Sequence, residues 1–137
     1  MLPDIRKHFI TAYSKDDKLL FRGNDLGEQS FKNALEANLG SLVTCEYYVL
    51  KRVAADAKLK IMSFEVTELV GVCDRRGALG VEGVPARFTE VNGTIEIETD
   101  ATEEQLKELQ EKVAVMCPVH DLYRAAGVKF NVEWIKK

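Results

Sequence analysis

The sequence lacks a long apolar run, a dense set of cysteines and a stripe of basic residues. Without an apolar segment of signal-peptide or membrane-spanning length, neither secretion nor insertion into a bilayer is predicted. The 19 basic residues are interspersed with 22 acidic ones and the net charge is −3, which argues against a nucleic-acid partner. We therefore expect a cytosolic protein that has neither a nucleic acid nor a membrane as its partner.

Cysteine is scarce, with three in 137 residues, and the number is odd. Such a set does not form the disulfide framework of a small secreted domain. In a reducing compartment a disulfide is transient rather than structural, so catalysis or redox sensing is the natural use of these thiols. The sequence also has no repeat, and 46% of its residues are hydrophobic. These features predict one folded domain over residues 1–137.

The pattern of apolar residues predicts alternating strands and helices. Apolar or β-branched runs at 9–13 and 19–21 flank a turn-like segment and predict a hairpin. From Glu28 to Ala57 apolar residues recur at helical spacing, and Asp25 is a plausible cap for this long helix. Further along, the pattern predicts strands at 61–73 and 87–99 around a glycine-containing connection. It then predicts a helix opened by a Thr102–Gln105 capping box and a short helix from Pro118 that ends at Gly127. A last strand is predicted at 128–135. The expected fold class is α+β.

The motif Cys117-Pro118-Val119-His120 offers a thiol where a helix is expected to begin. Proline suits the first position of a helix, so Cys117 falls at the N-cap, where backbone N–H groups and the helix dipole favour a thiolate. His120 lies one turn further along and adds positive charge when it is protonated. The alternative is that Cys117 is a small apolar residue that closes the preceding helix. Cys117 and His120 alone do not make a tetrahedral metal site.

Cys45 lies inside the expected long helix. A turn of 100° per residue places it between the apolar stripe, centred on Leu42, and a polar flank. It is either a packed small hydrophobe or a thiol that acts with Cys117. Glu46 falls within the apolar stripe, where an unpaired carboxylate is expensive. Either Glu46 meets a cation, or this face lines a wet site or a subunit boundary, or the helix is rotated so that Glu46 reaches solvent.

Several short segments, in a fixed order, carry a resemblance to a known family. They are Leu39-Gly-Ser-Leu-Val-Thr-Cys45, Phe64-Glu65-Val66, Phe88-Thr-Glu-Val91 with the acidic helix start Asp100-Ala-Thr-Glu-Glu104, and Cys117-Pro-Val-His120. In this order and spacing they resemble the OsmC/Ohr family of osmotically induced and organic-hydroperoxide-resistance proteins. The resemblance implies an OsmC-like α+β fold and an intertwined homodimer, in which long central helices pack between sheets and the two thiols meet near the subunit interface.

The resemblance also implies an activity, the reduction of organic hydroperoxides by a cysteine pair. Cys45 is then the peroxidatic thiolate, which attacks the O–O bond, releases an alcohol and becomes a sulfenic acid. Cys117 is then the resolving thiol, and its condensation with that acid gives a Cys45–Cys117 disulfide and water. A dithiol, in the family a lipoyl group on a carrier protein, reduces this disulfide by thiol exchange. The implied mechanism requires no metal, flavin or other cofactor.

In related enzymes an arginine favours the thiolate and a glutamate orients that arginine. Arg22, at the end of the second expected strand, is the nearest positional match to the arginine; the alternative is that it is an ordinary exposed strand residue. The family's Asn-Pro-Glu helix start is missing here and Leu35 stands at its Glu position, which leaves Glu36 as the nearest carboxylate. A divergent member of this kind is alternatively a non-catalytic OsmC-like stress protein that binds an apolar ligand or a partner. Cys73 has no role by resemblance and is expected to be core filler or a bystander.

Overall fold

The computed structural model describes residues 2–137, which form two compact units. One unit extends to Ala37 and the other runs from Asn38 to Lys137. Helix α1, Ala34–Asp56, begins in the first unit and continues in the second. The expected α+β class is confirmed, because both helices and sheets are present along the chain.

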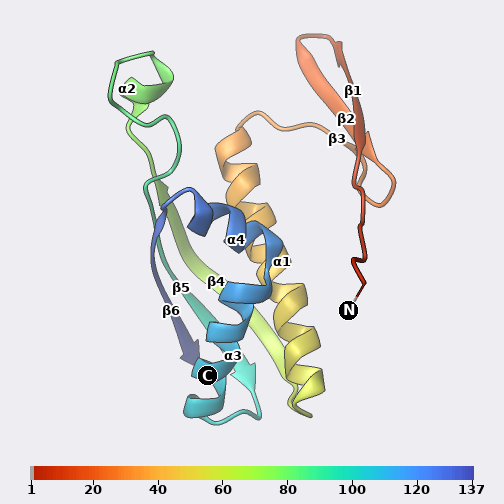
Figure 1. Ribbon diagram of the computed structural model, residues 1–137, viewed down its shortest axis with the longest axis vertical. Helices are drawn as coiled ribbons and strands as arrows, with labels where there is room; N and C mark the ends of the chain where they lie inside the picture. Colours follow the sequence, from red (N-terminus) through yellow and green to blue (C-terminus); the bar gives the residue numbers. More distant parts are fainter. Residues whose placement is uncertain (1) are drawn as a thin grey trace. The chain divides into compact units, whose positions relative to one another are not determined.

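The first unit contains a three-stranded antiparallel sheet (Figure 1). Strands β1, Ile10–Lys15, and β2, Lys18–Gly23, form the predicted hairpin. The two residues between them, Asp16 and Asp17, have φ of 52° and 58°. Two consecutive residues with positive φ make the turn whose twist matches that of paired strands. The hairpin prediction is confirmed.

A third strand occupies the segment where the long helix was predicted to start. Strand β3, Gly27–Gln29, pairs with β2 and places Glu28 opposite Arg22. Gly27 has a φ of +70°, which glycine adopts at little cost, so the chain turns back onto β2 here. The prediction of a helix from Glu28 is wrong because residues 27–29 pair with the preceding strand β2, and the helix begins only at Ala34.

Helix α1 has its own start and stop signals. The side chain of Asn33 accepts a hydrogen bond from the Glu36 N–H at 3.0 Å and so caps the start of the helix. The prediction of Asp25 as the cap is therefore wrong. At the other end Lys58 has a φ of +60°, and the N–H of Leu59 donates to the carbonyl of Ala54 at 2.8 Å. This left-handed residue and the bond that follows it terminate the helix.

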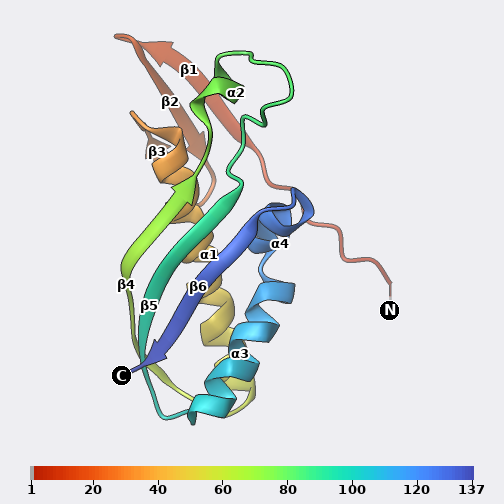
Figure 2. The same ribbon diagram turned by 90° about the vertical axis from the view of Figure 1, so that its left-hand side faces the viewer.

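The second unit is a three-stranded sheet with the helices α1, α3 and α4 against one face (Figures 1 and 2). The strand order is β4-β5-β6, with β5 antiparallel to β4 and parallel to β6. A parallel pair needs a crossover connection, which α3 and α4 supply. The elements after α1 are β4 (Ile61–Val72), α2 (Arg75–Ala78), β5 (Glu90–Thr99), α3 (Glu103–Met116), α4 (Pro118–Ala125) and β6 (Lys129–Lys136).

The main core lies between this sheet and the helices α1 and α3 (Figure 2). Leu50 of α1, Ile95 and Ile97 of β5, and Val113 of α3 are each at most 1% exposed and belong to one cluster. Complete burial of such a side chain contributes about 1.5–3 kcal/mol. The cluster therefore holds α1 and the end of α3 in a fixed relation; Cys117 belongs to it and Cys45 packs against it.

Two predicted helix boundaries are confirmed. The Thr102 hydroxyl accepts a hydrogen bond from the Gln105 N–H at 3.1 Å, and the Gln105 side chain accepts one from the Thr102 N–H at 2.8 Å. This is the reciprocal capping box at the start of α3. After α4, Gly127 has a φ of +82°, the left-handed conformation that ends many helices.

Candidate active site

The structure brings Cys45 and Cys117 together. Cys45 lies near the middle of α1, and Cys117 lies at the junction of α3 and α4. Both pack in the main core, Cys117 fully buried and Cys45 partly buried. They lie close enough for Cys45 to raise the pKa of Cys117, and no disulfide joins them.

Cys117 occupies the N-cap of α4, as the sequence predicts. The N–H of His120 donates to its sulfur at 3.4 Å, and Pro118 takes the first helical position. The predicted thiolate is wrong, because burial and the neighbouring Cys45 thiol raise the pKa of Cys117 to about 12 from its ordinary value of 9.0. The bond from the His120 N–H lowers that pKa by less than burial raises it. Cys117 is a neutral thiol at physiological pH.

Glu46, the carboxylate in the apolar stripe of α1, meets the imidazole of His120 on α4. Nδ1 of His120 and Oε1 of Glu46 are 3.0 Å apart, and the two side chains are 14% and 8% exposed. Among the alternatives left open by the sequence, exposure of Glu46 to solvent is wrong, because the carboxylate is buried and lies against a histidine. The sequence did not identify the partner because it lies 74 residues away. The sequence did indicate that Glu46 needs a partner, because an unpaired carboxylate in an apolar stripe is energetically unfavourable.

A cavity of about 220 Å³ adjoins this polar pair. Glu46 and His120 line it, and the His120 ring stacks on Phe130 with centroids 4.0 Å apart. Its remaining walls come from α3 and β6: Gln110, Val113, Ala114, Phe130, Val132 and Trp134. The cavity is therefore mostly apolar, with one polar pair at its edge.

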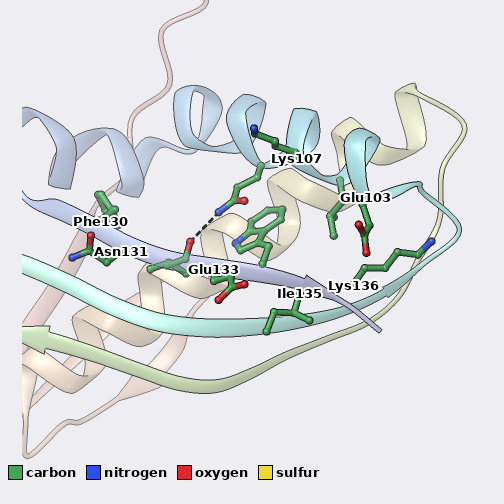
Figure 3. Close-up of a pocket in the computed structure, with 11 residues that line it drawn as sticks. Glu103, Lys107, Phe130, Asn131, Glu133, Ile135 and Lys136 are labelled. Atoms are coloured by element: carbon green, nitrogen blue, oxygen red, sulfur yellow. Dashed lines mark hydrogen bonds between the residues drawn. The ribbon is translucent and has the colours of Figure 1, made fainter.

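A larger hollow, of about 610 Å³, lies between α3 and the edge strand β6 (Figure 3). Its rim is charged, with Glu103 and Lys107 on α3 and Glu133 and Lys136 on β6. The side chain of Gln110 crosses between the two elements and donates to a β6 carbonyl at 3.2 Å, the dashed line in Figure 3. Within the described chain none of the cysteines lines this groove, so it is separate from the thiol pair.

Arg22 and Glu36, the predicted supports for Cys45, lie in the first unit. The Arg22 guanidinium and the Glu28 carboxylate are 3.2 Å apart, and the Tyr13 hydroxyl donates to the same carboxylate at 3.3 Å. Glu36 lies in the first turn of α1. A supporting role for Arg22 or Glu36 at Cys45 stays a prediction.

Cys73 follows strand β4 and is partly buried. It packs against a second, smaller cluster that contains the buried Phe88 and Val91. This is the setting of a small hydrophobe, as the sequence predicts. Among residues 2–137, no group of three or more His, Cys, Asp or Glu side chains is placed to hold a metal ion.

Residues 27–133 match the family model described as OsmC-like protein. The match covers most of the chain and includes Cys45 and Cys117. The chain belongs to the OsmC-like protein family. The resemblance inferred from the short sequence segments is thereby confirmed.

Solved structures share the fold over nearly the whole chain. The chain is similar to an OsmC-like protein from Mycoplasma pneumoniae, with 21% identity, 96% of this chain and 97% of that chain covered, and a TM-score of 0.79. It is also similar to an organic hydroperoxide resistance protein from Elizabethkingia anophelis, with 14% identity, coverage of 99% and 100%, and a TM-score of 0.68. For the organic hydroperoxide resistance protein OhrB of Bacillus subtilis the identity is 16%, the coverage 96% and 98%, and the TM-score 0.56. At these identities the likeness shows the fold.

Comparison with curated proteins gave no match. Along residues 2–137 no helix combines the length and apolarity that crossing a bilayer requires. Family membership and fold are therefore established, and the chemistry of the site is argued from its own residues.

Proposed function

We propose that this protein is a thiol-dependent peroxidase for organic hydroperoxides, with Cys45 as the nucleophile and Cys117 as the resolving thiol. The observation that carries the proposal is the contact between a partly exposed thiol and a fully buried one. A nucleophile must be accessible to its substrate, and Cys45 is the accessible member of the pair. Cys117 is buried and neutral, so it is shielded from peroxide and reacts with its neighbour.

The proposed cycle has three steps. The Cys45 thiolate attacks the hydroperoxide, the O–O bond breaks, an alcohol leaves after taking up a proton, and the sulfur keeps the other oxygen as a sulfenic acid. Cys117 then attacks that sulfur; its thiol proton leaves with the hydroxyl group as water, and a Cys45–Cys117 disulfide forms. A lipoyl-type dithiol supplies two electrons and two protons by thiol exchange, which restores both thiols and leaves the dithiol oxidised.

In this proposal Arg22 supplies the positive charge that favours the Cys45 thiolate. Glu28 orients the guanidinium within the first unit, where the two groups are 3.2 Å apart. Glu36, in the first turn of α1, is the other candidate carboxylate. An arginine is suited to this work because it stays charged at physiological pH and donates several hydrogen bonds.

The proposal includes a homodimer. On the helices α1, α3 and α4 of the second unit, four large apolar side chains are strongly exposed in the single chain: Tyr48 at 64%, Val115 at 65%, Met116 at 44% and Leu122 at 70%. Met116 directly precedes Cys117, and Tyr48 follows Cys45 by three residues. Exposed apolar patches of this kind mark interaction surfaces. Light scattering coupled to size-exclusion chromatography checks this, and a monomer at micromolar concentration would contradict it.

The activity is tested by adding one equivalent of cumene hydroperoxide to the reduced protein and mapping the cysteines by mass spectrometry. We expect prompt loss of the Cys45 and Cys117 thiols and an intramolecular disulfide between them, with Cys73 still free. Hydrogen peroxide, added in a parallel sample, should react more slowly. Unreacted thiols, or slow oxidation led by Cys73, would refute the proposal.

The second candidate function is non-catalytic binding of an apolar ligand. The cavity of about 220 Å³ beside Glu46 and His120 favours it, because Phe130, Val132 and Trp134 give that cavity apolar walls. The two functions are separated by the same experiment. A binding protein leaves cumene hydroperoxide unconsumed, whereas a peroxidase converts it to the alcohol.

A further inference from the structure

Two polar contacts tie α4 to α1. One is the Glu46–His120 contact at 3.0 Å, and the other is the hydrogen bond that the Tyr123 hydroxyl donates to the Asn38 side chain. They differ in how far their α1 residue lies from Cys45 along the chain. Glu46 directly follows Cys45, whereas Asn38 precedes that cysteine by seven residues.

The Glu46–His120 contact is connected to both thiols. On α1, Glu46 shares a peptide bond with Cys45. On α4, the backbone N–H of His120 donates to the sulfur of Cys117 at 3.4 Å, while its ring stacks on Phe130. Glu46 is therefore linked to Cys45 and His120 to Cys117, so the contact between Glu46 and His120 connects the two segments that carry the thiols.

Stability does not explain why a carboxylate occupies position 46. The other inward positions of α1 are apolar, with Leu42, Val49, Leu50 and Val53 at most 6% exposed. Exchange of a buried charged pair for packed apolar side chains is often neutral or stabilising, because desolvation offsets much of the attraction. The polar pair supplies a directional contact of defined length, which an apolar pair does not. Formation of a disulfide has the same requirement, since the two sulfurs must meet within narrow geometric limits.

We propose that Glu46 and His120 are positioning residues that hold Cys45 and Cys117 in the arrangement needed for their disulfide. The inference deepens the proposed function, since it concerns the same thiol pair. In the step concerned, both thiols lose a proton and an electron, an S–S bond forms, and a disulfide oxidant takes up two electrons and two protons. Neither Glu46 nor His120 is consumed or changed in that step.

The test is the thiol–disulfide equilibrium of the folded protein with reduced and oxidised dithiothreitol at pH 7, with a Cys73→Ser background to simplify the readout. The decisive variant is Glu46→Leu/His120→Phe, which removes both polar groups and so leaves no buried charge without a partner. We expect this variant to be at least as stable to heat as the parent. We expect its equilibrium constant for the Cys45–Cys117 disulfide to fall about tenfold, the effect of one buried hydrogen bond.

Two further variants separate positioning from general packing. Glu46→Gln keeps an oxygen that accepts the hydrogen bond from Nδ1–H, and its equilibrium constant should stay close to that of the parent. Tyr123→Phe removes the other polar contact between α1 and α4 while keeping the aromatic ring, and it should also leave the constant unchanged. The inference is overturned if the double variant forms the disulfide as readily as the parent, or if Tyr123→Phe shifts the equilibrium equally.

This result is independent of hydroperoxide chemistry because dithiothreitol is the redox partner. If the parent forms the disulfide but does not consume cumene hydroperoxide, the proposed function fails and the positioning inference can still hold. If the parent consumes the hydroperoxide and the double variant keeps the parent equilibrium constant, only the positioning inference fails. If the parent forms no Cys45–Cys117 disulfide with oxidised dithiothreitol, the positioning inference is overturned whatever the peroxide assay shows.

Discussion

Asp74 and Cys117 hold the same place at the start of two helices, and their side chains have opposite protonation behaviour. Asp74 caps α2 and accepts a hydrogen bond from the Arg76 N–H at 3.0 Å, while the Arg76 guanidinium pairs with the same carboxylate. This contact with Arg76 lowers the pKa of Asp74 below its ordinary value. Cys117 caps α4 and accepts the His120 N–H, yet burial raises its pKa to about 12.

The comparison shows that a cap position alone does not decide the charge of the residue that occupies it. The N–H groups of a helix start favour an anion in both places. At Asp74 the site is open to solvent and a guanidinium adds to the effect. At Cys117 the loss of solvent outweighs the single N–H bond, and the neighbouring Cys45 adds to the rise of the pKa. A thiolate nucleophile is therefore not expected at the cap, and the proposed peroxidatic role falls to Cys45.

Cys45→Ser is the change with the largest expected effect. It removes the proposed nucleophile and leaves Cys117, the N-cap residue of α4, in place. Hydroperoxide consumption should therefore fall to the uncatalysed rate. A colorimetric assay of residual cumene hydroperoxide measures this. If Cys117 were the nucleophile instead, Cys45→Ser would keep the first, stoichiometric reaction with hydroperoxide, and the assignment of the nucleophile to Cys45 would be wrong.

Cys117→Ser should separate the first step from the rest of the cycle. Cys45 should still consume about one equivalent of hydroperoxide per chain, since only resolution depends on Cys117. Turnover with a lipoyl-type dithiol should be lost or greatly slowed. Trapping of the Cys45 sulfenic acid with dimedone, read by mass spectrometry, checks the stalled state, and undiminished turnover in this variant would rule out Cys117 as the resolving thiol.

Local signals were sufficient to predict most of the fold. The Thr102–Gln105 capping box and the glycine at 127 are sequence features whose physical effect is confined to a few residues, and both were located correctly. Strand β3 was missed because its evidence is the pairing of Glu28 with Arg22 on another strand. Helical spacing within one segment carries no information about such a pairing.

In the candidate site, too, local features were predicted and features that depend on the folded chain were not. The N-cap position of Cys117 follows from Pro118 and is confirmed. Its protonation state depends on how completely the surrounding chain excludes water, which is a property of the folded core. The need of Glu46 for a partner was evident from the apolar stripe, but the identity of His120 depends on how α4 returns over α1.

The raised pKa of Cys117 predicts a loss of stability in alkali. In the unfolded chain the thiol ionises near its ordinary value of 9.0, whereas in the folded protein it stays neutral until about 12. Its favourable contribution is therefore complete below pH 9 and is lost as the pH rises toward 12. Urea unfolding at several pH values should show a steeper decline for the parent than for Cys117→Ala. Equal slopes would mean that the cap is not protected from ionisation.

Asp74→Asn should give the smallest effect, in the opposite pH direction. The pKa of Asp74 is lowered from 3.8 by the contact with Arg76, so its contribution is present above pH 3.8 and is lost as the pH falls through the folded value. Because both side chains are well exposed, at 66% for Arg76 and 41% for Asp74, solvent and salt screen the pair. The parent should be only slightly more stable than Asp74→Asn at pH 7 in thermal unfolding, and the difference should vanish in acid. An effect at pH 7 as large as the alkaline loss at Cys117 would show that the exposed cap contributes as much as the buried one.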